Sequence, residues 1–168
     1  MQRKEEGQLP KERKQKILKM KLVKPHKLIS REVIPEDYKR VKECFQDMFK
    51  LLYKDLGDYC KGGYAIAHSQ VDDKDPLRFF VTREGEIVIN PIIHDHVRHA
   101  TTKMEGCMTY PDTPPTAVER WHKCKATYKR LKENGVISEI KKDLVGLQAQ
   151  IFQHETDHMN GIYVHDKR

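Results

Sequence analysis

The run HETDH at residues 154–158 carries the residue types of a catalytic metal site. His154 and His158 are four residues apart, so on a helix they project from one face and two imidazoles can hold one cation. Glu155 follows the first histidine and can reach a water molecule on that cation as a general base. The pattern therefore predicts a metal-dependent hydrolase with His154 and His158 as ligands.

The third ligand separates the classes of HExxH enzyme. The pattern HExxHxxGxxH, typical of metzincin proteases, would need a histidine at position 164, where Val164 stands. His165 comes one residue late, and on a tight turn one residue reverses the side-chain direction, so we expect it to be a poor ligand. A thiolate is the other natural ligand for zinc or ferrous iron. Cys107, in the segment EGCMT, is one candidate, and Cys60 is its rival.

Two helices are expected to frame the chain. Residues 36–56 place apolar side chains at steps of three and four, between Pro35 and Gly57, which predicts an amphipathic helix. A second helix is predicted from about 144 to 159, ended by Asn160-Gly161. Leu147 and Ile151 share a stripe with the two histidines of this second helix, so the histidines are expected to face the core.

The residues between these helices read as strands. Residues 78–91 predict two strands around a Glu-Gly turn, and residues 124–130 alternate, which makes Cys124 a core residue. Asn134-Gly135 predicts a hairpin turn. Cys44 lies beside the stripe of the first helix and is expected to pack in the core. The fold class is therefore α+β, with mainly antiparallel sheets packed around a central C-terminal helix and one N-terminal amphipathic helix.

Composition narrows the setting. Of the 168 residues 38% are hydrophobic and 34% charged, which excludes a wholly disordered chain. The net charge of +7 indicates a lysine-rich surface or a nucleic-acid partner such as the ribosome. We expect residues 1–16 to form a polar basic arm and residues 17–168 a single catalytic domain. The absence of a signal peptide, a membrane-spanning stretch and a CxxC pair predicts a cytoplasmic protein.

Three segments match, in order, the motifs of a known family. GYAIAHSQ at 63–70 resembles GxGhAAxQ, in which h is apolar; EGCMT at 105–109 resembles EGCLS; and QHETDHMNG at 153–161 resembles QHExDHhxG. These are the motifs of peptide deformylases, and weaker similarity extends from about Met20 to Asp166. The chain thus resembles a peptide deformylase over most of its length except the arm.

Some positions depart from the family pattern. Ala65 replaces the second glycine of the first motif and His68 its second alanine. The arginine that many relatives carry soon after the second motif is absent, because the run there is DTPP at 112–115. The chain stops seven residues after Gly161, which resembles the short variants encoded by some bacteriophages and would place the protein in the cytoplasm of a bacterial host.

The resemblance implies a reaction and a role for each matching residue. Cys107, His154 and His158 would hold one divalent ion, ferrous iron in preference, with nickel, cobalt or zinc as substitutes. Glu155 would move protons during removal of the formyl group from an N-formylmethionyl peptide. Further residues are expected to act as follows: Gln70 and the Met108 backbone N–H stabilise the oxyanion; Arg120 braces the cysteine loop through Glu105; and Gly63, Tyr64, Ala65, Ile66, Glu105, Gly106, Leu147, Gln150 and Ile151 bind substrate.

Two alternatives stay open on the residues alone. One is another metal-dependent amide hydrolase or protease of HExxH type; the other is a non-catalytic basic protein whose metal site is closed by a fourth protein ligand. As partners we expect N-formylmethionyl peptides and the ribosome, with the basic arm aiding ribosome docking, but no membrane; we expect the protein to be a monomer.

Overall fold

The computed structural model describes residues 20–57, 60–96, 100–132 and 134–167. The expected arm at residues 1–16 lies outside these ranges. Within them, no helix combines the length and the apolar character needed to cross a membrane.

The described elements mix short helices with antiparallel strands, which confirms the predicted α+β class. Their order and bounds are η1 Pro35–Asp37, α1 Tyr38–Leu51, β1 Asp55–Gly57, β2 Cys60–Lys61, β3 Ala65–Ala67, η2 His68–Gln70, β4 Phe79–Thr82, β5 Ile87–His94, β6 Ala100–Glu105, β7 Thr116–Trp121, β8 Lys123–Leu131, β9 Ile137–Val145, α2 Leu147–Met159 and η3 Val164–Lys167.

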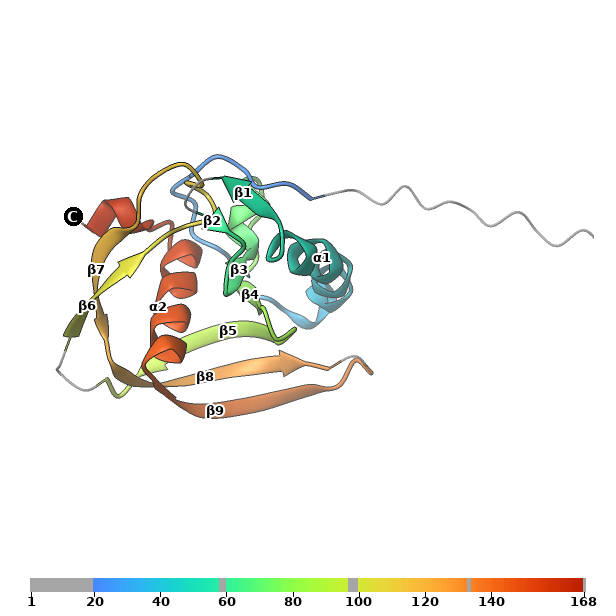
Figure 1. Ribbon diagram of the computed structural model, residues 1–168. Helices are drawn as coiled ribbons and strands as arrows, with labels where there is room; N and C mark the ends of the chain where they lie inside the picture. The colour runs from blue at the N-terminus through green and yellow to red at the C-terminus, as the bar shows by residue number, and fades with distance from the viewer. Residues whose placement is uncertain (1–19, 58–59, 97–99, 133, 168) are drawn as a thin grey trace, which may run out of the picture.

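The strands form three antiparallel sheets. The largest has the order β3-β4-β5-β8-β9, and two pairs, β1-β2 and β6-β7, complete the set. In Figure 1, α2 lies at the centre of the fold, with β5, β8 and β9 below it, β6 and β7 to one side, and α1 on the far side of β3 and β4. The helix that carries HETDH is therefore enclosed by the sheets, as predicted.

The first helix is shorter than predicted. It begins with a 3-10 turn at Pro35 and its α-helical part ends at Leu51, so the expected continuation to residue 56 is wrong. The backbone N–H groups of Leu52, Tyr53 and Lys54 each donate to the carbonyl three residues earlier, which tightens the last turn, and the chain then enters β1. Apolar spacing continues past Leu51, and the tertiary pairing of β1 with β2 overrides it.

The second helix starts three residues later than predicted. Leu144 and Val145 belong to β9, where they pair with Cys124 and Lys123 of β8. Gly146 then turns the chain with a φ of 60°, in the left-handed region that favours glycine. The glycine carbonyl accepts the N–H of Gln150, which starts the α-helical bonding.

Two of the three clusters of buried side chains join the helices to the largest sheet. One joins α1 to β4 and β5, and Cys44 packs in it as predicted. The other joins α2 to β8 and includes Cys124, Ala126 and Tyr128, the face predicted from the alternation of residues 124–130. The predicted strands around the Glu84-Gly85 turn and the β8-β9 hairpin at Asn134-Gly135 are also present.

Candidate active site

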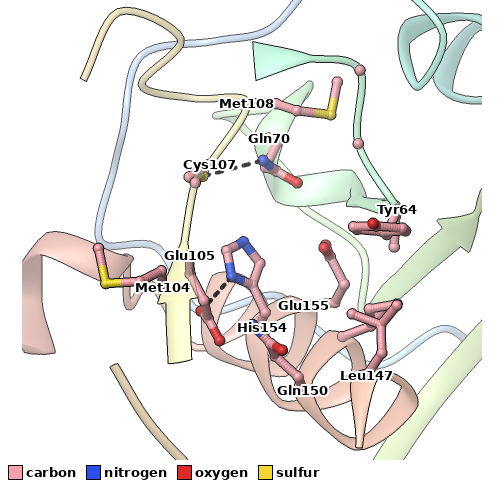
Figure 2. Close-up of a pocket in the computed structure, with 15 residues that line it drawn as sticks. Tyr64, Gln70, Met104, Glu105, Cys107, Met108, Leu147, Gln150, His154 and Glu155 are labelled. Carbon is pink, nitrogen blue, oxygen red and sulfur yellow. Dashed lines mark hydrogen bonds and ion pairs between the residues drawn. The ribbon is translucent and has the colours of Figure 1, made fainter. Parts of the chain in front are cut away.

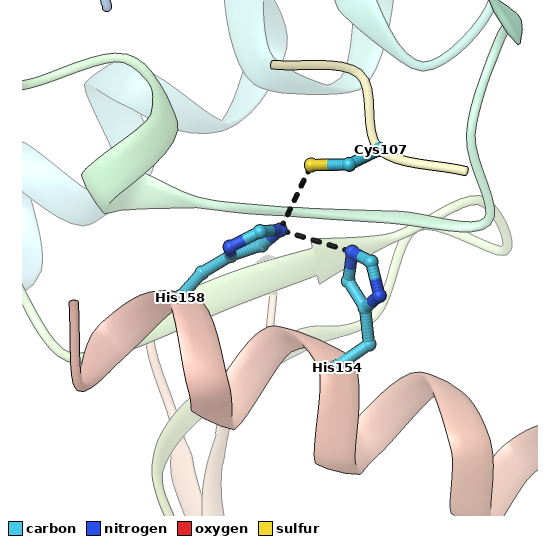
Figure 3. A group of neighbouring side chains, drawn as sticks. All are labelled: Cys107, His154 and His158. Carbon is cyan, nitrogen blue, oxygen red and sulfur yellow. Dashed lines mark hydrogen bonds between the residues drawn. The ribbon is translucent and has the colours of Figure 1, made fainter. Parts of the chain in front are cut away.

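Three candidate ligands converge at one point. His154 and His158 project from the same side of α2, and Cys107 comes from the loop that follows β6 (Figure 3). The Nε2 atoms of the two histidines are 2.9 Å apart, and the Cys107 Sγ lies 3.3 Å from the His158 Nε2. All three ligand atoms fall within 4.8 Å of one another. The structure thus brings together residues separated by about fifty positions in the chain.

The donor set fits a divalent cation. Two ligands held at about 2.0–2.3 Å from one ion with tetrahedral angles lie about 3.3–3.8 Å apart; the observed separations of 3.3 and 2.9 Å are at this range or a few tenths of an ångström below it. The His154 Nδ1 faces the Glu105 carboxylate at 2.9 Å, so the proton sits on that nitrogen and the Nε2 presents a lone pair to the site. Within the described residues the group has these three members, which leaves a position for water or substrate.

A buried ion pair braces the first histidine. Arg120 of β7 donates from Nε and Nη2 to the two oxygens of Glu105, at 2.8 and 2.7 Å, and from Nη1 to Asp157 of α2. Glu105 and Arg120 are each only 3–4% exposed. Burial alone would raise the pKa of Glu105, but the bonds from Arg120 and His154 lower that pKa to about 2. The carboxylate therefore stays ionised and orients the imidazole.

The ligands perturb one another strongly. Burial would raise the pKa of the Cys107 thiol, but the charge of His158 and hydrogen bonds from both histidines lower it well below its ordinary value. Burial would lower the pKa of His154, and the partners Cys107 and Glu105 raise it to about 10. A thiolate beside a protonated histidine is a charge pair that a divalent cation can replace, because the cation displaces the proton from the imidazole and binds the thiolate.

Glu155 differs from Glu105 in having an oxygen without a hydrogen-bond partner among the described residues. Its side chain is 3% exposed, and its Oε2 is buried with no hydrogen-bond partner among the described residues. Burial raises the pKa of this carboxyl group. A buried carboxyl oxygen without a partner costs free energy, which makes Glu155 a candidate for a chemical role.

Gln70 points its amide at the site from η2. Its Oε1 accepts the N–H of Ala67 at 2.9 Å, which fixes the Nε2 as the inward donor. That Nε2 lies 3.0 Å from the Thr109 Oγ1 and 3.8 Å from the Cys107 Sγ. The residue after the cysteine, Met108, is buried, and its side chain contacts the chain at Gly63.

These groups open into one cavity of about 230 Å³ (Figure 2). Its lining combines polar groups from the site with apolar side chains from β3 and α2. The lining residues are Gly62, Gly63, Tyr64, Ala65, Gln70, Met104, Glu105, Gly106, Cys107, Met108, Leu147, Gln150, Ile151, His154 and Glu155.

Of the residues expected to bind substrate, Ile66 does not line the cavity, and Leu147 lines it from a more exposed position than predicted. Ile66 is fully buried and does not line the cavity, because successive side chains of β3 point to opposite faces and Ile66 faces the core near α1. Leu147 lines the cavity but is 48% exposed, so it lies at the mouth and not on the core-facing stripe that the periodicity predicts.

The structure adds Gly62 and Met104 to the cavity wall. Gly62 has a φ of 84°, and a Cβ there would lie 2.3 Å from the Leu52 carbonyl oxygen, so only glycine fits this close approach. The Gly-Gly pair at 62–63 is the signal that sequence reasoning could have used. Met104 is 65% exposed at the end of β6, and its position directly before the EGCMT segment was its only signal.

His165 and Cys60 were the other possible third ligands, and the structure describes the side chain of His165 alone. His165 lies 3.1 Å from the Thr116 Oγ1 and packs against Tyr110, outside the three-ligand group. The side chain of Cys60 lies outside the described part of the structure.

Comparison with known proteins places this chain in a family. A family model described as polypeptide deformylase matches residues 16–168. A peptide deformylase of Thermotoga neapolitana is 32% identical over 112 residues, 65% of this chain and 64% of that relative. A peptide deformylase of Brucella suis is 33% identical over 150 residues, 83% of this chain and 81% of that relative. The chain therefore spans less than two thirds of the Thermotoga relative's length.

Solved structures agree with the sequence relatives. The crystal structure of peptide deformylase from Thermotoga maritima matches with a TM-score of 0.69 and 27% identity, covering 84% of this chain and 88% of that one. Plasmodium falciparum peptide deformylase, in complex with an inhibitor, matches with a TM-score of 0.69 and 30% identity, covering 88% of each chain. On the family match, the relatives and the fold together, this chain belongs to the polypeptide deformylase family.

Proposed function

We propose that this chain removes the formyl group from N-formylmethionyl peptides and releases formate. One observation carries the proposal: Cys107, His154 and His158 converge at one point, and Cys107 and His154 line a cavity together with Glu155, which has one buried oxygen without a partner among the described residues. Family membership supports the same reaction. The products are formate and a peptide with a free α-amino group.

Cys107, His154 and His158 would hold one divalent ion, and ferrous iron is our preferred candidate. When bound, such an ion supplies Lewis acidity and lowers the pKa of water towards about 7. Arg120 and Glu105 hold the His154 imidazole in the tautomer that leaves its Nε2 free to bind. The lowered pKa of the Cys107 thiol also supports this donor set, since the thiolate is the form that binds a cation.

The chain's own groups move the protons and stabilise the charge. Glu155 accepts a proton from the attacking water and delivers it to the methionine nitrogen as the bond from formyl carbon to nitrogen breaks. The Gln70 amide donates to the oxygen that gains negative charge, and we propose the Met108 backbone N–H as the second donor. Loss of one such donor typically slows a reaction by about 10²–10³.

The cavity wall supplies the binding surface for the first side chain. Ala65, Leu147 and Ile151 offer apolar atoms to a methionine side chain, and Tyr64 stands 56% exposed at the mouth. Gln150 adds a polar amide to the same wall. We propose that this mixed wall binds the thioether side chain, with Gly63 and Gly106 leaving room for the peptide backbone.

The substrate class is tested by comparing three peptides on one protein sample. Formyl-Met-Ala-Ser should release formate, whereas acetyl-Met-Ala-Ser and Met-Ala-Ser should remain uncut at their internal bonds. Glu155→Ala should abolish formate release. Cleavage of the unformylated peptide without formate release from the formylated one would replace this proposal with a protease of the HExxH type.

A further inference from the structure

His68 is a fully buried histidine outside the cavity, and its ring is held on three sides. The Nδ1 accepts the backbone N–H of Leu77 at 3.0 Å, and the Nε2 lies 3.6 Å from the Sγ of Cys44 on α1. The ring also stacks on Phe79 of β4, with centroids 4.9 Å apart. One side chain thus connects η2, α1 and the start of β4.

The contacts fix one neutral form of this ring. Because the Nδ1 accepts a backbone N–H, the proton is on the Nε2, which faces the thiol sulfur of Cys44. Burial and the nearby Arg40 lower the pKa of His68 to about 4, while Asp72 and Asp75 oppose the shift. Burial raises the pKa of Cys44 to about 11. Both groups are therefore uncharged near neutral pH, and the pair is suited to structure and not to proton transfer.

His68 opens the three-residue turn that carries Gln70. The His68 carbonyl accepts the N–H groups of Val71 and Asp72, both at 3.0 Å, which closes the turn on its far side. The Gln70 side chain is in turn oriented by the N–H of Ala67. The direction of the Gln70 amide therefore depends on the backbone at residues 67–70, and this backbone is anchored by the His68 ring.

The loop beyond the turn is tied to the same helix. Arg40 of α1 forms ion pairs with Asp72 at 2.7 Å and Asp75 at 2.6 Å. The His68 ring closes the loop by bonding residue 77, nine positions further on. An alanine at position 68 would leave the buried N–H of Leu77 without its acceptor, which destabilises the loop in its present position. These ion pairs are partly exposed, whereas the bond from Leu77 to His68 is buried.

We infer that His68 is a positioning residue for the proposed deformylation: its ring fixes the turn from which Gln70 directs its amide into the site. The inference rests on the proposed function, because Gln70 matters only if an oxyanion forms there. It is specific to this chain, since the ring bonds both the backbone and α1, which a methyl group cannot do.

The first experiment separates positioning from binding. His68→Ala should lower kcat about tenfold with KM within about twofold, since a displaced Gln70 loses part of the 10²–10³ that one donor supplies. His68→Asn should restore most of kcat, because its Oδ1 can take the place of the Nδ1 as acceptor for Leu77. Cys124→Ala, which removes a buried thiol from the other core cluster, should leave kcat unchanged. All variants are assayed well below their unfolding midpoints, so that the folded fraction is equal.

A double-mutant cycle with Gln70 provides the sharper test. If His68 acts through Gln70, His68→Ala should have little further effect on kcat in a Gln70→Ala background. An equal tenfold loss in both backgrounds would overturn the inference, as would a loss of stability in His68→Ala with kcat unchanged. Absence of formate release from the wild-type protein would instead count against the proposed function, so the two failures are distinguishable.

Discussion

At the residue scale, burial shifts the pKa of two side chains, Glu155 and His68, that have different hydrogen-bonding environments. Burial disfavours the charged form of both, raising the pKa of Glu155 and lowering that of His68. His68 has partners for both ring nitrogens, whereas one oxygen of Glu155 has none. His68, with both nitrogens bonded, stabilises the structure, whereas Glu155 lines the cavity in which we propose that it transfers a proton.

His68 should make the protein less stable in mild acid. Its folded pKa is about 4 against an ordinary value of 6.5, so its contribution is fully present above pH 6.5 and is lost as the pH falls through 4. The loss amounts to up to about 3 kcal/mol of unfolding free energy. Urea unfolding from pH 7.5 to 4 should show a shallower decline for His68→Asn than for wild type. Parallel declines would rule out this contribution.

The spacing of residues in the sequence was sufficient to predict the two histidines of the site. The four-residue interval predicts that His154 and His158 share one face of a helix, and the structure shows this. Cys107 had no periodicity to support it, and only the family motif distinguished it from Cys60. The sequence could not show whether Ile66 faces the cavity or the core, because all three residues of β3 are buried and apolar and the strand has no polar alternation.

At the element scale, one arginine joins the two strands and the helix that build the site. Arg120 on β7 bonds Glu105 at the end of β6 and Asp157 on α2, and Lys167 of η3 approaches Asp157 from the other side at 2.8 Å. This network aligns α2 with the cysteine loop. The helix and the loop come from distant parts of the chain, so their alignment depends on such cross-links.

Arg120→Met should disrupt this alignment. Removing the cation takes the guanidinium partner from the buried Glu105 carboxylate, which should cost about 3–5 kcal/mol in unfolding free energy, while Asp157 keeps Lys167. Arg130→Met on β8 is the matched control: it removes a partly exposed ion pair to Glu86 and should cost about 0–1 kcal/mol. Chemical denaturation of both variants measures the difference. Equal losses of unfolding free energy in the two variants would show that the buried Arg120 pair stabilises the fold no more than the partly exposed Arg130 pair.

Element identities were easier to predict than element ends. The apolar spacing that predicts α1 and α2 reflects which faces are buried, and those faces exist. The ends of the helices depend on strand pairing with distant residues. After Leu51 the chain enters β1, which pairs with β2, and Leu144 and Val145 pair with β8. The Gly146 turn was the local signal that would have corrected the start of α2.

At the scale of the whole molecule, the two ends of the described chain close around the C-terminal half of α2. The N–H of Ser30 donates to the Met159 carbonyl at 2.8 Å, and Lys27 forms an ion pair with Asp166. Ser69 donates to the carbonyl of His158 at 3.1 Å. Helix α2, which carries the candidate ligands His154 and His158, is thus bonded to both ends of the described chain. We therefore expect cation binding to increase the stability of the whole domain.

Metal ions should therefore raise the unfolding temperature. Nickel or ferrous ion at about 100 times its Kd should add about 2.7 kcal/mol, or about 5–10 °C for a protein of this size. Cys107→Ala should lose most of the shift, because one of the three ligands is gone. Cys124→Ala, which removes a buried thiol from the core on β8, should retain it. A metal-induced shift of equal size in Cys107→Ala would contradict the assigned ligand set.

The central claim is that one metal-dependent site containing Glu155 hydrolyses the formyl group, and formate release per bound metal ion measures it most directly. Wild type and Glu155→Gln should be purified without oxygen, loaded with ferrous ion or nickel, analysed for metal content and assayed on formyl-Met-Ala-Ser. We predict about one ion per chain in both, rapid formate release by the wild type, and at least a 10²-fold lower rate for Glu155→Gln. Equal rates at equal metal content would contradict the account.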